Sequence, residues 1–165
     1  GDQMGMLATL MNALALFSFL DRNRVVSQVF SARGMPGIVK DYDKNEALSA
    51  LSGGKVGIFA GGTGNPFFTT DTAACLRAIE LESDLVVKAT NVDGVYSSDP
   101  NTDESAKMYD SISFEEVIKR DLRVMDLTAI LLCRDHDMPI VVCSIKTEGN
   151  LLKAANGELV GTKVS

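Results

Sequence analysis

The sequence has few cysteines, and they do not form a recognisable set. Cys75, Cys133 and Cys143 are widely separated, and no two of them make a Cys-x-x-Cys pair. An odd, scattered set excludes a small domain held together by disulfides and is typical of a reducing, cytoplasmic compartment. The first apolar segment also lacks the preceding basic residue that a secretory signal peptide requires.

Positive charge is scarce as well. Sixteen Lys and Arg stand against 22 Asp and Glu, which gives a net charge of −6 and a pI near 4.8. Nucleic-acid binding that is independent of sequence needs cations to neutralise phosphates, so we exclude it and expect no nucleic-acid partner. A small phosphorylated ligand is still compatible with this charge, because backbone N–H groups and one or two cations suffice to hold it.

The remaining composition is that of an ordinary globular protein. The chain has 165 residues, of which 45% are hydrophobic and 23% charged, and both fractions are close to the averages for soluble proteins. These values exclude wholesale disorder and a collagen-like fibre. The length predicts one domain, since compact domains are most often roughly 100–150 residues long.

The chain opens with a long uncharged stretch, Met4–Leu20. Its length lies at the lower limit of a membrane span, which needs roughly 17–25 residues. Thr9, Asn12 and Ser18 interrupt the stretch, so we favour a buried helix and expect no membrane partner. Apolar side chains surround most of this helix, and we therefore expect cover on both sides, by a subunit partner or by further sequence on the second side.

After this stretch, short apolar runs alternate with helical patterns. Apolar runs bounded by glycines or charged residues predict strands, and apolar residues at helical spacing predict helices. The predicted strands are Val25–Phe30, Lys55–Ala60, Asp84–Thr90 and Pro139–Ile145, and the predicted helices are Asn45–Leu51, Asp71–Glu82, Phe114–Arg120, Asp126–His136 and Gly149–Asn156. This alternation indicates an α/β fold with a mostly parallel sheet between helices.

The most informative segment is Gly61–Asp71 (GGTGNPFFTTD), between a predicted strand and a predicted helix. Ligands of open α/β sheets bind where strands end and helices begin. The glycines allow the backbone to approach an anion, the threonines add hydroxyl donors, and the two phenylalanines suit a planar base. Thr70 or Asp71 can cap the helix. The alternative is an ordinary turn with Phe67 and Phe68 in the core. Neither a Walker A loop nor a GxGxxG fingerprint is present.

Two further segments offer polar groups. Lys88–Pro100 (KATNVDGVYSSDP) carries a cation, hydroxyls, an aromatic ring and two carboxylates where a predicted strand ends. The alternative is that Asp99 and Pro100 form a turn and Tyr96 is a surface aromatic. Asp126 opens an apolar helix, either as a helix cap or as a functional carboxylate.

These segments resemble one family. Gly61–Asp71, continued by TAACLR, is similar to the nucleoside-monophosphate loop of bacterial uridylate kinases, and Lys88–Pro100 resembles the adenine-nucleotide segment of the amino-acid kinase superfamily. Matches also occur at Val124–Leu127 (VMDL), at Arg134–His136 before a proline-led strand, and at Gly1–Met6. The resemblance runs through the whole chain in order.

The resemblance implies the amino-acid kinase (carbamate kinase-like) fold and transfer of the ATP γ-phosphoryl group to UMP with Mg²⁺, giving UDP and ADP in pyrimidine nucleotide (CTP) biosynthesis. Asp126 would be the catalytic residue that organises the phosphates and magnesium, and no residue is expected to form a protein metal site. Asp2 would contact the UMP ribose. The other residues implied for UMP are Thr63, Gly64, Asn65, Pro66, Phe67, Phe68, Thr69 and Thr70, and those for ATP are Thr90, Tyr96 and Asp99.

The resemblance also implies how the chain is organised. We expect one partial domain, with a UMP portion at 1–83 and an adenine-nucleotide portion at 84–165. Family members begin with a lysine and a glycine-rich phosphate turn that do not occur here. The chain therefore resembles the C-terminal two thirds of such an enzyme, and we expect it to be inactive alone.

Assembly can be anticipated in the same way. The resemblance implies a homohexamer built from dimers through the Met4–Leu20 helix, and Glu at Leu10 and Leu14 is then expected to yield monomers. Two alternatives to a uridylate kinase remain: a superfamily kinase with another small acceptor, such as an amino acid or carbamate, and a non-catalytic module for nucleotide sensing or assembly.

Overall fold

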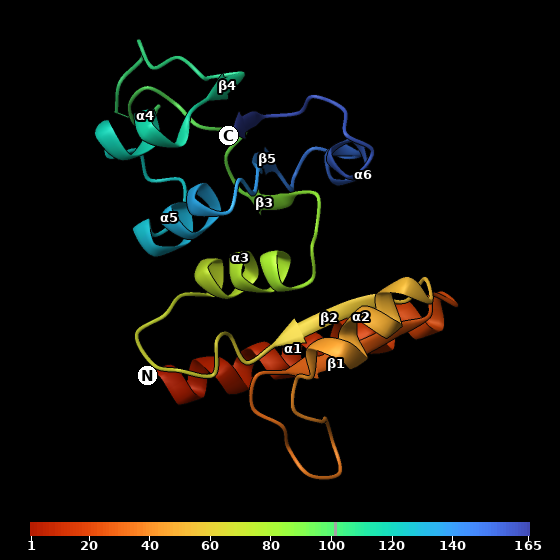
Figure 1. Cartoon of the computed structure of the whole chain (residues 1–165). Coiled ribbons are helices and arrows are strands. Elements are labelled where there is room, and N and C mark those ends of the chain that lie inside the picture. Colours follow the sequence, from red (N-terminus) through yellow and green to blue (C-terminus); the bar gives the residue numbers. More distant parts are fainter. Residues whose placement is uncertain (101) are drawn as a thin grey trace. The chain divides into compact units, whose positions relative to one another are not determined.

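The computed structural model describes residues 1–100 and 102–165. The chain forms two compact units, Gly1–Ala74 and Cys75–Ser165, and the boundary falls within helix α3 (Thr70–Glu80) (Figure 1). The ligand portions expected from the sequence, 1–83 and 84–165, divide the chain close to this boundary. Their assignment to UMP and to ATP stays a prediction.

The first unit is a pair of parallel strands with two helices. Its elements are α1 (Asp2–Arg22), β1 (Ser27–Ser31), α2 (Lys44–Ser52) and β2 (Val56–Ala60). Strands β1 and β2 pair in parallel, with Val29 opposite Ile58. The side chains of Leu10 and Ala13 from α1 pack against Ile58 and Ala60 of β2. Because the strands are parallel, their carboxyl ends meet at one edge of this sheet.

Helix α1 is covered on one side only by the unit to which it belongs. Leu10 and Ala13 are buried, and Leu14 packs against the same cluster. The apolar side chains left exposed are Met4, Leu7, Met11, Leu16, Phe17 and Phe19. The helix is also long and apolar enough to cross a membrane, but core helices of soluble proteins can have the same length and composition. Leu10 and Leu14 therefore face the chain's own core. Glu at these positions would disrupt this unit, so a loss of oligomers in such a variant would not identify a subunit interface.

The second unit is built on a four-stranded mixed sheet in the order β3–β5–β6–β4. Its strands are β3 (Val86–Thr90), β4 (Ser111–Ile112), β5 (Ile140–Ser144) and β6 (Thr162–Val164), and its helices are α4 (Phe114–Lys119), α5 (Leu127–Asp135) and α6 (Asn150–Ala155). Strand β5 is parallel to β3 and antiparallel to β6. The predicted α/β class with mostly parallel strands is confirmed. Strands β4 and β6 were not anticipated, because two or three residues are too few to show a pattern.

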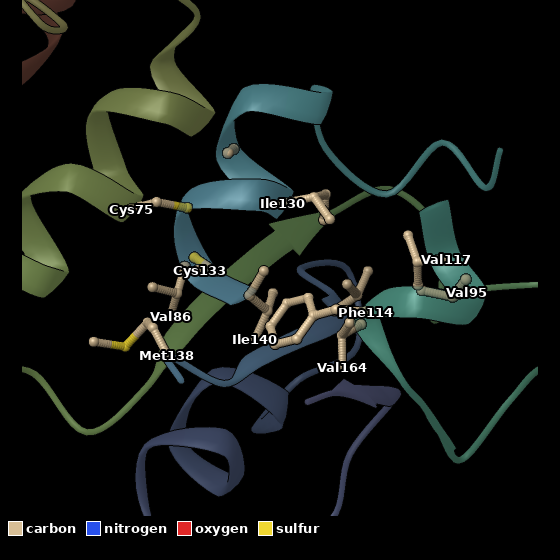
Figure 2. Packing of buried hydrophobic residues seen from close by; sticks show 12 residues of the cluster. Cys75, Val86, Val95, Phe114, Val117, Ile130, Cys133, Met138, Ile140 and Val164 are labelled. Atoms are coloured by element: carbon tan, nitrogen blue, oxygen red, sulfur yellow. The ribbon is translucent and has the colours of Figure 1, made fainter. Parts of the chain in front are cut away.

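Strand β5 lies at the centre of this unit and is buried along its whole length. Ile140 and Val142 belong to a core cluster with residues of α4, α5 and β3, which Figure 2 shows from close by. Val141 and Cys143 pack on the opposite side with Ala154 of α6. Burial on both faces explains why this strand reads as an unbroken apolar run. All three cysteines of the chain are buried, and none of them forms a disulfide.

Candidate functional site

The glycine-rich turn begins directly after β2. Gly61, Gly62 and Gly64 have φ angles of +77°, +59° and +78°, in the left-handed region that glycine adopts without steric cost. A Cβ at Gly64 would lie 3.3 Å from both the Cβ and the carbonyl oxygen of Ala32, which follows β1. Arg33 Nε donates a hydrogen bond to the Gly64 carbonyl oxygen at 3.3 Å. The turn therefore lies tightly against the end of the neighbouring strand.

Helix α1 holds the loop at two points. Thr9 Oγ1 accepts a hydrogen bond from the Gly61 N–H at 2.9 Å. Asp2 Oδ2 accepts one from the Phe67 N–H at 3.0 Å. Asp2 is far from the loop in sequence, and the fold brings it to the loop; its contact with UMP stays a prediction. Helix α1 and the residues that follow β1 thus hold the glycine-rich loop in place. The glycine-rich sequence of the loop would not fix its conformation by itself.

The two phenylalanines of the loop are exposed. Phe67 is 96% exposed and Phe68 is 52% exposed, so the alternative that places them in the core is wrong. Phe67 also has a φ of +70°, a conformation that costs a residue with a Cβ about 1 kcal/mol or more. An aromatic ring held in solvent on strained backbone is more typical of a ligand contact than of a structural turn.

The hydroxyl groups of the loop have different roles. Thr63 Oγ1 accepts a hydrogen bond from the Asn65 N–H at 3.2 Å and tightens the turn. Thr69 Oγ1 accepts one from the Thr72 N–H at 3.2 Å, so Thr69 caps α3. Thr70 and Asp71, the two capping residues predicted from the sequence, are the first two residues of the helix. Residues Asn65–Thr70 are all exposed. They are accessible to a ligand at the N-terminus of α3.

A pocket of about 460 Å³ lies in the second unit, where β3 ends. Thr90, Tyr96 and Asp99 all line it, so the three residues expected on the ATP side come together in one place. Its volume lies within the range of small-molecule sites, roughly 300–1,000 Å³. The carbonyl oxygen of Asp99 also accepts a hydrogen bond from the Asp103 N–H at 2.9 Å. The turn reading of Asp99 and its place at the pocket are therefore both correct.

The same pocket contains two arginines that were missed from the sequence, Arg120 and Arg123. Arg120 Nη1 donates a hydrogen bond to the Tyr109 hydroxyl at 2.9 Å, and its Nε donates to the Glu116 carboxylate at 2.5 Å. That guanidinium lowers the pKa of Glu116, by its hydrogen bond first and its charge second. Arg123 lies directly before the VMDL motif and Arg120 three residues earlier, and this proximity is the signal that could have revealed them. They place two positive charges at the pocket, and that of Arg120 is paired with the Glu116 carboxylate.

Asp126 is the N-cap of α5. Its Oδ1 accepts a hydrogen bond from the Ala129 N–H at 3.2 Å. Leu122 and Val124, just before it, line the pocket, whereas Asp126 is not among the lining residues. The cap reading is thus correct, and a second role stays a prediction. Within 1–100 and 102–165, no three His, Cys, Asp or Glu side chains gather closely enough to hold a metal ion.

The comparisons with known proteins agree on one family. Residues 1–144 match the amino acid kinase family. The chain is 53% identical over 164 residues to uridylate kinase of Pseudomonas syringae pv. syringae (strain B728a), covering 99% of this chain and 67% of that protein. Its fold matches UMP kinase from Ureaplasma parvum (TM-score 0.94, 37% identity) and from Bacillus anthracis (TM-score 0.97, 36% identity), over 99% of this chain and 70% and 68% of those chains. The chain spans about two thirds of the length of these relatives and belongs to the uridylate kinases of the amino acid kinase family.

Proposed function

We propose that the whole protein transfers the γ-phosphoryl group of ATP to UMP, giving UDP and ADP. The observation that carries this proposal is the glycine-rich loop, which presents exposed rings and N–H groups at a helix N-terminus and is held by Asp2. The loop would take UMP, with Asp2 toward the ribose, the rings of Phe67 and Phe68 toward the base, and Thr69 and Thr70 toward the phosphate.

The pocket beside β3 would take the adenine nucleotide. Tyr96 and the aliphatic residues around it offer apolar surface for the base, and Arg120 and Arg123 offer charge for the phosphates. A single carboxylate at Asp126 fits magnesium, since Mg²⁺ in such sites is held by one or two carboxylates and by the phosphates of the substrate. When bound, Mg²⁺ supplies charge that stabilises the phosphates during transfer.

In this reaction a UMP phosphate oxygen forms a bond to the γ-phosphorus, and the bond from that phosphorus to the β-bridging oxygen breaks, releasing ADP. The protein contributes little covalent chemistry to such a step and acts through position and charge. The loop residues would orient the acceptor phosphate, and the arginines would hold the donor.

We also propose that the 165-residue chain binds nucleotides but does not turn them over by itself. The chain spans only about two thirds of the length of its relatives, and loss of one charge-stabilising group typically costs roughly 100-fold or more in rate. UDP formation from UMP and ATP should be undetectable for the chain alone. It should appear when the chain is fused to the N-terminal third of the Pseudomonas syringae relative.

Binding measurements separate the candidate acceptors. Isothermal titration should show binding of UMP in preference to CMP and no binding of glutamate. The Phe67→Ala variant should bind UMP about fivefold or more weakly, because a base stacked on an aromatic ring is stabilised by about 1–3 kcal/mol. Ile38→Ala, a matched change at a residue that is 59% exposed outside the loop, should bind UMP as the wild type does. Preference for glutamate would instead support a kinase with another acceptor.

A fusion protein that binds both nucleotides yet forms no UDP would support the non-catalytic module. Such a result would contradict the kinase proposal. The fusion would then hold both substrates in position and carry the N-terminal third as well, and these together should suffice for transfer.

For assembly, we propose a homohexamer built from dimers that form through the exposed side of α1. Met4, Leu7 and Met11 lie on this side and are 76%, 49% and 70% exposed. Three apolar side chains at helical spacing form a stripe that a second helix can cover. The three buried cysteines, none of which forms a disulfide, support a cytoplasmic location for the reaction.

A further inference from the structure

Thr162 of β6 is fully buried and carries a hydroxyl with two partners. Thr162 Oγ1 accepts a hydrogen bond from the Val95 N–H at 2.8 Å and donates one to the Tyr109 carbonyl oxygen at 2.5 Å. Tyr109 N–H in turn donates to the Val95 carbonyl oxygen at 2.9 Å. One side chain from the C-terminal strand therefore joins two segments that lie far from it in sequence.

Val95 belongs to the wall of the nucleotide pocket, between Gly94 and Tyr96, which line it too. The segment that follows Tyr96 pairs with the chain around Lys107, where the Ser97 N–H donates to the Lys107 carbonyl oxygen at 2.9 Å. Gly94–Tyr96 belongs to no helix or regular strand itself. The position of this wall therefore depends on the packing of the Val95 side chain in the core cluster and on hydrogen bonds such as those made by Thr162.

Two glycines let β6 approach the wall so closely. A Cβ at Gly94 would lie 2.5 Å from Thr162 Oγ1, and a Cβ at Gly161 would lie 1.9 Å from the Val142 carbonyl oxygen and 2.7 Å from that of Asp93. Gly161 also has a φ of +60°. The Thr162 hydroxyl therefore fits in this place only because Gly94 and Gly161 have no side chains.

We propose that Thr162 is a positioning residue for nucleotide binding, which fixes the Gly94–Tyr96 wall through the Val95 N–H and the Tyr109 carbonyl. This inference rests on the proposed function of the pocket as the ATP site. Thr162 lies beyond residues 1–144, which match the family, and it does not itself line the pocket. It acts on the ligand only through the wall.

The physical reason is the cost of leaving buried polar groups without partners. Without the hydroxyl, the Val95 N–H and the Tyr109 carbonyl lose their partner and can recover hydrogen bonds only by moving the wall toward water. The free protein then populates an altered wall, and a nucleotide binds only the fraction that keeps the original one. Affinity falls by that fraction even though no ligand contact has been removed.

The test compares ATP binding to the 165-residue chain and its variants by isothermal titration. Thr162→Val keeps the shape and removes the hydroxyl, and it should bind ATP about tenfold more weakly. Thr162→Ser keeps the hydroxyl and should restore most of the affinity. Val164→Ala is the matched control, because Val164 is a fully buried neighbour in β6 that does not line the pocket. It should lower the melting temperature and leave ATP affinity unchanged.

Amide hydrogen exchange gives a second, ligand-free measurement. The Val95 N–H should be protected in the wild type and in Thr162→Ser, and it should exchange much faster in Thr162→Val. Thr162→Ala provides another folded variant without the hydroxyl if valine is not accepted at this site. Equal ATP affinity for Thr162→Val and wild type, or a Val95 N–H that exchanges rapidly in the wild type, would overturn the inference. A wild-type chain that does not bind ATP while Val95 stays protected would overturn the ATP-site assignment instead.

Discussion

Asp126 offers a direct test of whether a helix cap also serves the reaction. Its Oδ1 caps α5 through the Ala129 N–H, and α5 buries Ala129, Ile130 and Cys133. Asparagine caps a helix about as well as aspartate, whereas alanine costs about 1 kcal/mol. Asp126→Ala should therefore lower the melting temperature by about 2–4 °C, and Asp126→Asn should leave it nearly unchanged.

The two Asp126 variants should differ in stability but should lose nucleotide affinity alike. Asparagine keeps the cap but lacks the negative charge that attracts Mg²⁺, so both variants should lose the gain in ATP affinity that magnesium gives the wild type. The expected loss is about 10–100-fold, the range typical when a carboxylate that supports a bound metal is removed. The measurement is isothermal titration with ATP, with and without Mg²⁺, alongside thermal unfolding.

Asp43 provides the matched control. It caps α2 by accepting a hydrogen bond from the Glu46 N–H at 2.8 Å. Asp43→Ala and Asp43→Asn should reproduce the stability pattern of the Asp126 pair without any effect on the magnesium dependence. If Asp126→Asn bound Mg-ATP as tightly as the wild type, the residue would be a cap and nothing more, and the catalytic role would be refuted.

Three further perturbations follow from the described contacts. Gly161→Ala should destabilise the protein by about 3 kcal/mol in urea unfolding, because its Cβ would overlap the Val142 carbonyl and its φ is positive. Arg120→Gln should raise the pKa of Glu116 toward its ordinary value in a carboxyl NMR titration; in the wild type the lowered pKa stabilises the fold above the unfolded-state pKa, and this contribution is lost as pH falls through the folded-state pKa. Leu7→Glu with Met11→Glu should yield a folded monomer by light scattering.

The glycine change has a matched control, and each of the three predictions has an outcome that would contradict it. Gly157→Ala also has a positive φ, +76°, but meets open space, so it should cost only about 1 kcal/mol. Equal losses for the two glycines would contradict the steric argument. An unchanged Glu116 titration would show that Arg120 is not the cause of the shift. An oligomer that persists in the α1 double variant would place the interface elsewhere.

The sequence predicted most of the helices and strands because their apolar residues follow clear periods. Strand β5 is buried on both faces, and its unbroken apolar run reveals it directly. Strand β6 is only Thr162–Val164 and follows a segment with no regular pattern. Its pairing with β5 depends on contacts over long range, which local sequence does not encode.

For the candidate sites, the sequence by itself determined the chemistry that the glycine-rich loop and the segment ending at Pro100 can offer. Only the tertiary structure decided which groups meet. It brought Asp2 to the Phe67 N–H, placed Phe67 in solvent, added Arg120 and Arg123 to the pocket, and turned Leu10 inward on α1. The reason is physical: residue type sets what a side chain can bind, whereas its partners and exposure depend on packing between segments distant in the chain.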